Sequence, residues 1–221
     1  MTGDHPAFAL PIPDSVAGRA VERRFEPEQE LFLEGDGADE LFGILAGRVK
    51  TWRTLDDGGA WTVLILGPGE LLGSVAVAQA GSHLISATAL DHVVAAAWSA
   101  PLFRAALKTA PDFADGFLRL VARRADQLME RIGDVAGLPV EKRVARVLLR
   151  LVCEASRDGE EFAAVAKVRQ QELAEMALTT VPTISRTLTA WSREGLVHAE
   201  RGRLTIPRLS RLAAVAGVEL D

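Results

Sequence analysis

The segment at residues 169–191, RQQELAEMALTTVPTISRTLTAW, constrains the fold of this chain more than any other. Ile184, Leu188 and Trp191 recur at spacings of four and three residues, which predicts one buried stripe along a helix. A shorter apolar-periodic stretch precedes it, with Leu173 facing inward. The segment therefore predicts two short helices joined by a tight turn.

The start of the second helix is marked by its own residues. Thr179 or Thr180 is suited to the N-cap, and Pro182 then falls in the first turn, where a missing N–H costs little. The turn itself falls at Leu178, a position usually given to glycine. A left-handed backbone at a leucine costs about 1 kcal/mol, so we expect either a rebuilt turn or a strained backbone.

The outward side chains of this second helix suit nucleic acid. A helix of this kind enters the DNA major groove, where arginine can donate a bidentate pair to guanine. Residues 201–206, RGRLTI, predict a hairpin with Gly202 near its tip, and a helix-turn-helix followed by such a hairpin is a winged helix. The alternative is that Arg186 is a solvated arginine on a protein-interaction domain. We expect DNA contacts from Arg169, Gln170, Gln171, Thr180, Val181, Pro182, Thr183, Ser185, Arg186, Arg201 and Arg203.

Charge is compatible with that reading although the net charge is −5. Residues 139–221 hold 13 of the 25 basic residues and 11 of the 30 acidic ones, so the C-terminal part is mildly basic. The start of the chain has no basic region before its prolines, and no apolar run reaches the length of a membrane span. We expect a cytoplasmic protein that does not enter a membrane. The single cysteine, Cys153, excludes an internal disulfide and any all-cysteine metal site.

Two further regions precede the winged helix. Short apolar or alternating runs separated by glycine-rich turns predict β-strands over residues 20–100, with a hairpin at Asp57-Gly58-Gly59. Residues 111–136 then change to helical periodicity, and a long amphipathic helix between domains often pairs with a copy of itself. The alternative is a helix packed on its own barrel. We expect the dimer interface to contain Phe117, Val121, Arg124, Leu128, Ile132 and Val135.

Four stretches together resemble the CRP/FNR family of bacterial transcription regulators. Residues 34–49 (EGDGADELFGILAGRV) resemble its β-roll signature, and residues 69–73 (GELLG) the start of its cyclic-nucleotide phosphate cassette. Residues 111–140 are similar to its dimerisation helix and hinge, and residues 183–186 (TISR) to the recognition helix of the FNR-type branch, whose half-site is close to TTGAT. The resemblance covers nearly the whole chain.

The resemblance implies an α+β protein in three parts. These are an N-terminal antiparallel β-roll of the cyclic-nucleotide-binding jelly-roll type over residues 1–110, a dimerisation helix and hinge over 111–137, and a winged helix-turn-helix over 138–221. It further implies a homodimer that binds palindromic double-stranded DNA and contacts RNA polymerase.

Departures from the family pattern bear on the effector. The family's ribose carboxylate and phosphate arginine align with Ser74 and Leu84, and its purine-binding positions with Leu128 and Met129, which disfavours cAMP and cGMP. The N-terminal cysteine cluster of oxygen-sensing relatives is absent, which excludes an iron–sulfur cluster. The acidic residue that reads cytosine is replaced by Pro182, so we expect altered specificity there. We expect the effector pocket to contain Gly73, Ser74, His83, Leu84, Ile85, Leu128 and Met129.

Three kinds of control remain open from sequence. The first is heme-based gas sensing, with His83 as a ligand and His92 or Met129 as the second. The second is a small hydrophobic or organic-acid effector, and the third is no effector at all. The sequence contains no catalytic triad with supporting motifs, no phosphate loop and no paired-histidine metal spacing, so we do not expect an enzyme. A regulatory module acting through protein partners would explain the β-roll but leave the winged helix unused.

Overall fold

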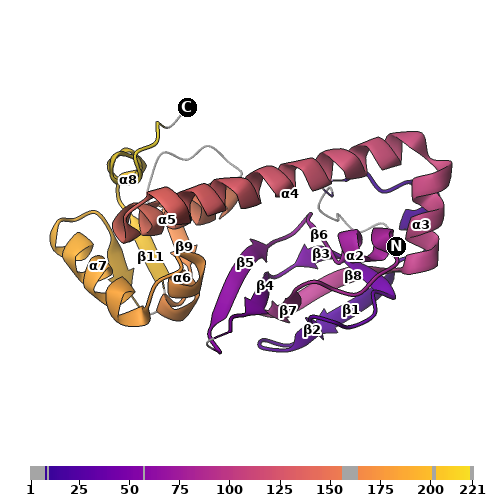
Figure 1. Cartoon of the computed structure of the whole chain (residues 1–221), viewed down its shortest axis with the longest axis horizontal. Helices are drawn as coiled ribbons and strands as arrows, with labels where there is room; N and C mark the ends of the chain where they lie inside the picture. Colours follow the sequence, from indigo (N-terminus) through magenta and orange to yellow (C-terminus); the bar gives the residue numbers. More distant parts are fainter. Residues whose placement is uncertain (1–7, 9, 57, 156–163, 201–202, 220–221) are drawn as a thin grey trace. The chain divides into compact units, whose positions relative to one another are not determined.

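The computed structural model of this 221-residue chain describes residues 8, 10–56, 58–155, 164–200 and 203–219. The chain separates into two compact units, Met1–Leu128 and Met129–Asp221. The division falls inside a long helix that continues through both units, α4 (Pro111–Gly137). Each unit is therefore described by itself below, and Figure 1 labels the elements of both.

The first unit is built on two antiparallel four-stranded sheets. Their strand orders are β1-β8-β3-β6 and β2-β7-β4-β5. The β4–β5 pair forms the hairpin that the sequence predicted around Gly58, with Arg53 opposite Trp61. The strands are β1 (Val21–Phe25), β2 (Glu30–Phe32), β3 (Glu40–Ala46), β4 (Val49–Thr54), β5 (Ala60–Leu66), β6 (Leu71–Leu72), β7 (Ser86–Ala89) and β8 (Val93–Ser99).

Apolar residues of both sheets form the core of this β-roll. Phe32, Phe42, Val49 and Leu66 belong to one buried cluster. Burying such side chains stabilises by about 1.5–3 kcal/mol each.

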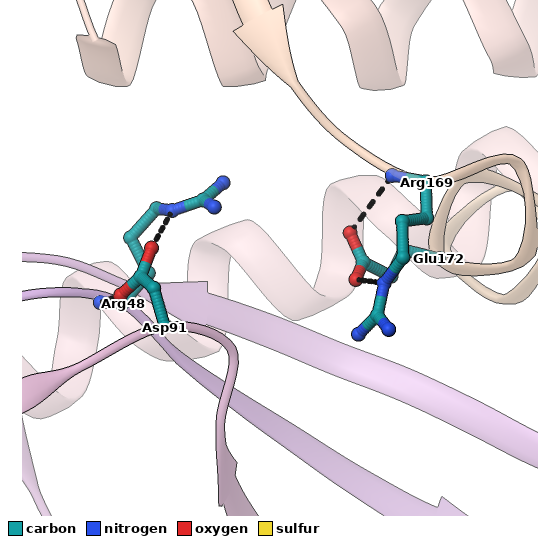
Figure 2. A network of polar contacts seen from close by, with 4 residues as sticks. All are labelled: Arg48, Asp91, Arg169 and Glu172. Atoms are coloured by element: carbon teal, nitrogen blue, oxygen red, sulfur yellow. Dashed lines mark hydrogen bonds and ion pairs between the residues drawn. The ribbon is translucent and has the colours of Figure 1, made fainter. Parts of the chain in front are cut away.

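The turn from β3 into β4 is held by one aspartate. Asp91 accepts from the Arg48 backbone N–H at 2.6 Å and from Arg48 Nε at 2.9 Å, the contact drawn on the left of Figure 2. Gly47 precedes this arginine with φ of +82°, and a Cβ there would collide with the carbonyl oxygen of His92. Glycine is therefore required at this turn, where the chain passes from one sheet to the other.

Helices close the first unit. Phe103 of α3 meets Phe113 and Phe117 of α4 edge-to-face, with ring centroids 5.4 and 5.5 Å apart. The start of α4 is thereby fastened to the roll by buried aromatic contacts. The helices of this unit are α1 (Asp14–Ala17), α2 (Ser74–Gln79), α3 (Ala100–Thr109) and the first part of α4.

The second unit contains a helix-turn-helix beside a small sheet. Helices α6 and α7 pack on one another, α5 packs on α8, and the three-stranded sheet has the order β10-β11-β9. The predicted wing hairpin is the β10–β11 pair, in which His198 lies opposite Thr205. The elements are α5 (Val140–Ala155), β9 (Ala164–Lys167), α6 (Gln170–Met176), α7 (Val181–Arg193), β10 (His198–Glu200), β11 (Arg203–Ile206) and α8 (Leu209–Ala216).

A buried carboxylate explains why the last turns of α4 belong to this second unit. Asp134 of α4 is 5% exposed and accepts from Arg146 Nη1 at 2.5 Å and from Arg150 Nη1 at 3.1 Å, both on α5. Arg146 also donates through Nε to the carbonyl of Ala216 at the end of α8. Two charge-assisted bonds to one carboxylate thus join α4 to α5. The bond from Arg146 to Ala216 adds α8 to this contact.

Candidate nucleic-acid interface and effector site

The packing of α7 matches the predicted stripe. Ile184, Leu188 and Trp191 are at most 4% exposed, while Ser185 and Arg186 are exposed. The hydrophobic stripe is buried within its own unit, so the opposite face of the helix is left to solvent. The prediction of a helix with one buried and one outward polar face is confirmed.

The first turn of α7 carries a chain of polar contacts. Thr180 is the N-cap, and its hydroxyl accepts from the Thr183 backbone N–H at 3.4 Å. Arg186 Nη2 donates to Thr183 Oγ1, also at 3.4 Å. Pro182 lies in the first turn, as predicted. Its side chain is exposed, and that of Val181 is half-buried. Arg186 thus lies in the N-terminal half of the helix, and the N-terminal residues of such a helix contact base edges in helix-turn-helix proteins.

The start of α6 is fixed by a buried glutamate. Glu172 is 5% exposed and accepts both from the Arg169 backbone N–H at 3.0 Å and from Arg169 Nε at 2.6 Å, as the right-hand pair in Figure 2 shows. Gln171 donates to Glu175 at 3.0 Å, and Gln170 is exposed. Gln170 therefore has its side chain at the surface near the helix N-terminus, where backbone amides favour phosphate.

A shallow groove joins the two helices. It has a volume of about 350 Å³ and brings Gln170 of α6 together with residues of α7. Four of its lining residues, Leu188, Thr189, Ser192 and Arg193, were not among the expected DNA contacts. For Thr189 and Arg193, the signal in the sequence was their i, i+4 relation on the polar face. The α7 residues are Ser185, Leu188, Thr189, Ser192 and Arg193.

The wing is described only in its strands. Arg201 and the predicted tip at Gly202 lie outside the described residues, and so does the side chain of Arg203.

The turn between α6 and α7 has the strained form. Leu178 has φ of +48°. Leu178 N–H donates to Glu175 O at 3.4 Å and Thr179 N–H to Ala174 O at 3.0 Å, which is the pattern of a Schellman motif with leucine in place of glycine. Of the two expectations for this turn, the strained backbone is the one found.

The residues expected around the effector differ in how exposed their side chains are. Leu84 and Met129 are each 67% exposed, whereas Ser74 is buried. Ile85 and Leu128 are half-buried, and Gly73 caps α2 with φ of +78°. His83 is 5% exposed and stacks on Phe32 at a centroid distance of 3.6 Å. Burial lowers the pKa of His83, with Asp36 opposing the shift, so the imidazole is neutral at pH 7.

A cavity of about 280 Å³ lies elsewhere in the first unit, between the β5–β6 loop and α4. It is lined by Glu70, Leu120, Arg123, Arg124 and Gln127, none of which was expected in the effector pocket. Glu70 accepts from the Gly67 backbone N–H at 2.8 Å. Arg124 Nη2 donates to the Leu71 carbonyl at 2.7 Å. This cavity therefore presents a carboxylate and two guanidinium groups.

The electrostatics of Arg124 are unusual for an arginine. Burial lowers the pKa of its guanidinium, Glu70 acts in the opposite direction, and Arg123 adds to the lowering. The described residues place no carboxylate in ion-pair contact with it. An arginine remains charged under such conditions, so the cavity holds a partly desolvated cation.

The two histidines considered as heme ligands, His83 and His92, do not fit that role. The ring of His83 is stacked flat on Phe32 with an interplanar angle of 8°, and a Cβ on Gly73 would lie only 3.1 Å from its Cε1. His92 lies on the surface, with Nδ1 3.0 Å from Oε2 of Glu26. The described residues contain no group of three or more histidine, cysteine or acidic side chains able to hold a metal ion.

The expected dimer residues recur every three or four residues and form one stripe of α4, part of which is used within its own chain. Phe117 contacts Phe103, and Arg124 bonds the Leu71 carbonyl, so both are used within their own chain. Val121 is half-buried, and Ile132 and Val135 are 57% and 42% exposed. A different set is exposed along the helix at alternating spacings of four and three: Leu118, Ala122, Ala125, Met129, Ile132 and Ala136. We call this set the outer stripe.

Two family descriptions match the chain, one for each functional region. The Cyclic nucleotide-binding domain family matches residues 22–110, and the Crp-like helix-turn-helix domain family matches residues 142–215. The chain belongs to the CRP/FNR family. It is a transcription regulator of the CRP/FNR type, with a helix-turn-helix for DNA binding.

Relatives of this CRP/FNR protein include two proteins named for cAMP. The Cyclic AMP receptor protein of Thermus thermophilus is 29% identical over 88% of each chain. The CRP-like cAMP-activated global transcriptional regulator of Mycobacterium tuberculosis is 27% identical over 83% of this chain and 82% of its own. The structure of FixK2 from Bradyrhizobium japonicum, at 17% identity, has a TM-score of 0.81 over 91% of this chain and 99% of its own, which shows the shared fold. No helix among the described residues is long and apolar enough to cross a membrane.

Proposed function

We propose that this CRP/FNR-type regulator binds a palindromic operator as a homodimer under the control of a small anionic effector. Residues 1–110 form the sensor domain, which holds the effector together with residues of α4 that face it. Residues 111–137 form the dimer, and residues 138–221 read DNA. The observation that carries the DNA-binding part is the exposed face of α7, where Ser185 and Arg186 lie opposite a stripe at most 4% exposed. RNA polymerase is the partner that family membership suggests.

The outer stripe of α4 supports the dimer. Its six residues repeat at a heptad spacing, and three large members, Leu118, Met129 and Ile132, are 57–67% exposed. The inward side of the same helix carries the residues bonded to their own unit, such as Phe113 and Arg124. An amphipathic helix with a second apolar seam left in water is suited to pair with a copy of itself.

The cavity beside Glu70 supports an anionic effector. A desolvated guanidinium gains a charge-assisted pair from a carboxylate or phosphate. Glu70 supplies an acceptor for a hydroxyl or amine of the same ligand, and Gln127 a further polar contact. Heme is not proposed, because His83 stacks on Phe32 and His92 contacts Glu26.

Because of this cavity, cyclic nucleotides are again candidates for the effector. The expectation against cAMP rested on Ser74 and Leu84 and on the apolar purine positions Leu128 and Met129. Glu70 and Arg124 bring a carboxylate and a guanidinium together from other positions. A cyclic nucleotide and a small hydroxy acid each combine an anionic group for the guanidinium with a hydroxyl for the carboxylate. The effector experiment therefore includes both kinds of compound.

DNA binding is tested by selection. Duplexes chosen by the protein from a random library are compared with unselected duplexes in mobility-shift assays at rising salt. We expect a TTGAT-like palindrome and salt-sensitive affinity. Failure to enrich any sequence, together with salt-insensitive binding, would instead favour a module that acts through protein partners.

The effector is tested by thermal shift and calorimetry with cAMP, cGMP, malate and citrate. We expect stabilisation by at least one anion and its loss in Arg124→Met. Leu84→Ala, at a site 67% exposed and outside the cavity, is the matched control and keeps the response. An anion response that survives in Arg124→Met places the effector elsewhere.

A further inference from the structure

One arginine connects the end of α4 with the turn of the helix-turn-helix. Arg143, in the first turns of α5, donates through Nε to the Ala177 carbonyl at 2.9 Å and through Nη2 to the Leu178 carbonyl at 3.0 Å. Its Nη1 donates to the Leu138 carbonyl, directly after α4, at 3.1 Å. The three bonds use different nitrogens of one planar group and reach carbonyls 5, 34 and 35 residues away in the sequence.

The carbonyls that it binds belong to helix ends. Ala177 is the C-cap of α6, and Leu138 follows the last residue of α4. Carbonyls at helix C-termini lack intrahelical partners and carry partial negative charge. A single guanidinium therefore satisfies orphan acceptors of two helices, and its fixed fork defines how far apart they lie.

The same group compensates for a costly backbone conformation. Leu178 is left-handed at φ +48°, a region that a leucine adopts only when its surroundings enforce it. The Schellman bonds of Glu175 and Ala174 satisfy the carbonyls before it, and Arg143 binds the two carbonyls that flank the strained peptide. A glycine at this position would need no such support.

We infer that Arg143 is a positioning residue for DNA reading: it holds the left-handed Leu178 turn and thereby sets α7 relative to α6. Its bond to Leu138 also ties that turn to the α4–α5 junction. The inference rests on the proposed DNA binding, and it assigns a role to a residue far from the base-reading face.

The experiment is a double-mutant cycle on the duplex that the unmodified protein selects. The variants are Arg143→Met, Leu178→Gly and both together, with affinity, base preference and thermal unfolding measured for each. We expect Arg143→Met to lose about tenfold in affinity for the selected duplex, because the strained turn is released. Binding to unselected duplexes at low salt should change little, because it depends on phosphate contacts.

Rescue distinguishes a positioning role from general stability. Leu178→Gly in the Arg143→Met background should return affinity to within about threefold of the unmodified protein, since glycine adopts the turn unaided. Lys142→Met is the matched control on the same helix, exposed and equal in charge removed, and should leave base preference unchanged. If Arg143→Met does not fold, Arg143→Lys replaces it in the cycle, because it keeps the charge and loses the fork.

Two results overturn the inference. One is unchanged selected-duplex affinity in Arg143→Met or Arg143→Lys, and the other is a loss that Leu178→Gly fails to restore. If the unmodified protein selects no duplex at all, the proposed function fails instead, and the two failures are thus separate.

Discussion

Arg186 is exposed on α7, with its guanidinium resting on Thr183 Oγ1 at 3.4 Å. That bond is weak and exchangeable, so the side chain is available to guanine O6 and N7. We expect Arg186→Ala to cost about 1–3 kcal/mol on the selected duplex and to flatten base preference, measured by fluorescence anisotropy at fixed salt.

Arg119 provides the control for that change. It is an exposed arginine on α4 in the first unit. Arg119→Ala removes the same charge and should leave base preference unchanged. Equal effects of the two substitutions would show that Arg186 contributes only general attraction to DNA.

His83 makes the stability of the β-roll depend on pH. Its pKa is lowered by burial in the folded state, so the unfolded chain binds the proton more tightly. Folding stability should therefore fall as the pH drops through about 6.5, the ordinary histidine value, and level off below the folded pKa.

A pH series of thermal unfolding for the unmodified protein and His83→Gln measures this effect. The unmodified protein should lose more stability than His83→Gln between pH 7 and pH 5. Parallel curves would mean that the lowered pKa of His83 contributes nothing to acid sensitivity.

Residues whose roles are local could be predicted from sequence. The Ile184–Leu188–Trp191 stripe, the Thr180 cap and the difficulty at Leu178 all follow from spacing within one helix and its turn. Arg143 and the cavity at Glu70 could not be predicted from spacing. Two of the three partners of Arg143 lie 34 and 35 residues away, and Arg124 and Glu70 are about 50 residues apart. No spacing rule encodes contacts that only the assembled fold creates.

At the scale of elements, the long helix was predicted with its bounds nearly right. The sequence did not distinguish the side of the helix that packs on its own unit from the side that is exposed. The apolar series through Phe117 and Arg124 lies partly on the side bonded to its own unit. Both faces of α4 carry apolar residues at helical spacing, so periodicity alone cannot say which one is covered within the chain.

The outer stripe gives a direct test of the dimer. Met129→Glu places a charge on the stripe at a site 67% exposed in the single chain, so it should not disturb folding. A charge in an apolar helix seam is costly to bury, and we expect a shift from dimer to monomer at micromolar concentration in analytical ultracentrifugation.

Glu130→Lys is the neighbouring control, since Glu130 is exposed and lies off the stripe. It should remain dimeric. A Met129→Glu protein as dimeric as the control would move the interface away from the outer stripe.

Two strands within the predicted β-region have no strand pattern of their own. β7 is a buried run of small residues, Ser86–Ala89, and β1, Val21–Phe25, is largely exposed. Neither shows the alternation of buried and exposed residues that identifies a half-buried strand. Their pairing in the two sheets, and not their own pattern, makes them strands.

At the scale of the molecule, Asp134 joins the last turns of α4 to the DNA-binding unit. Asp134→Ala leaves two arginines without their shared carboxylate. Because both arginines retain 27–30% side-chain exposure, the expected loss is about 1–3 kcal/mol, below that for a fully buried pair.

Urea unfolding monitored by circular dichroism measures that loss. Glu130→Ala, a surface change on the same helix, should stay within about 0.5 kcal/mol. An Asp134→Ala protein as stable as this control would show that the ion pairs do not hold the unit together.

The proposed homodimer uses two copies of α7 to read two half-sites. In dimeric helix-turn-helix proteins these half-sites lie about 10–10.5 base pairs apart. The most direct measurement is the stoichiometry and affinity of binding to the selected palindrome and to the same duplex with one half-site scrambled, over a range of salt. The account predicts two chains per palindrome, affinity that falls steeply with salt, and at least about tenfold weaker binding to the scrambled duplex. Equal affinity for both duplexes, or one chain per palindrome, would contradict it.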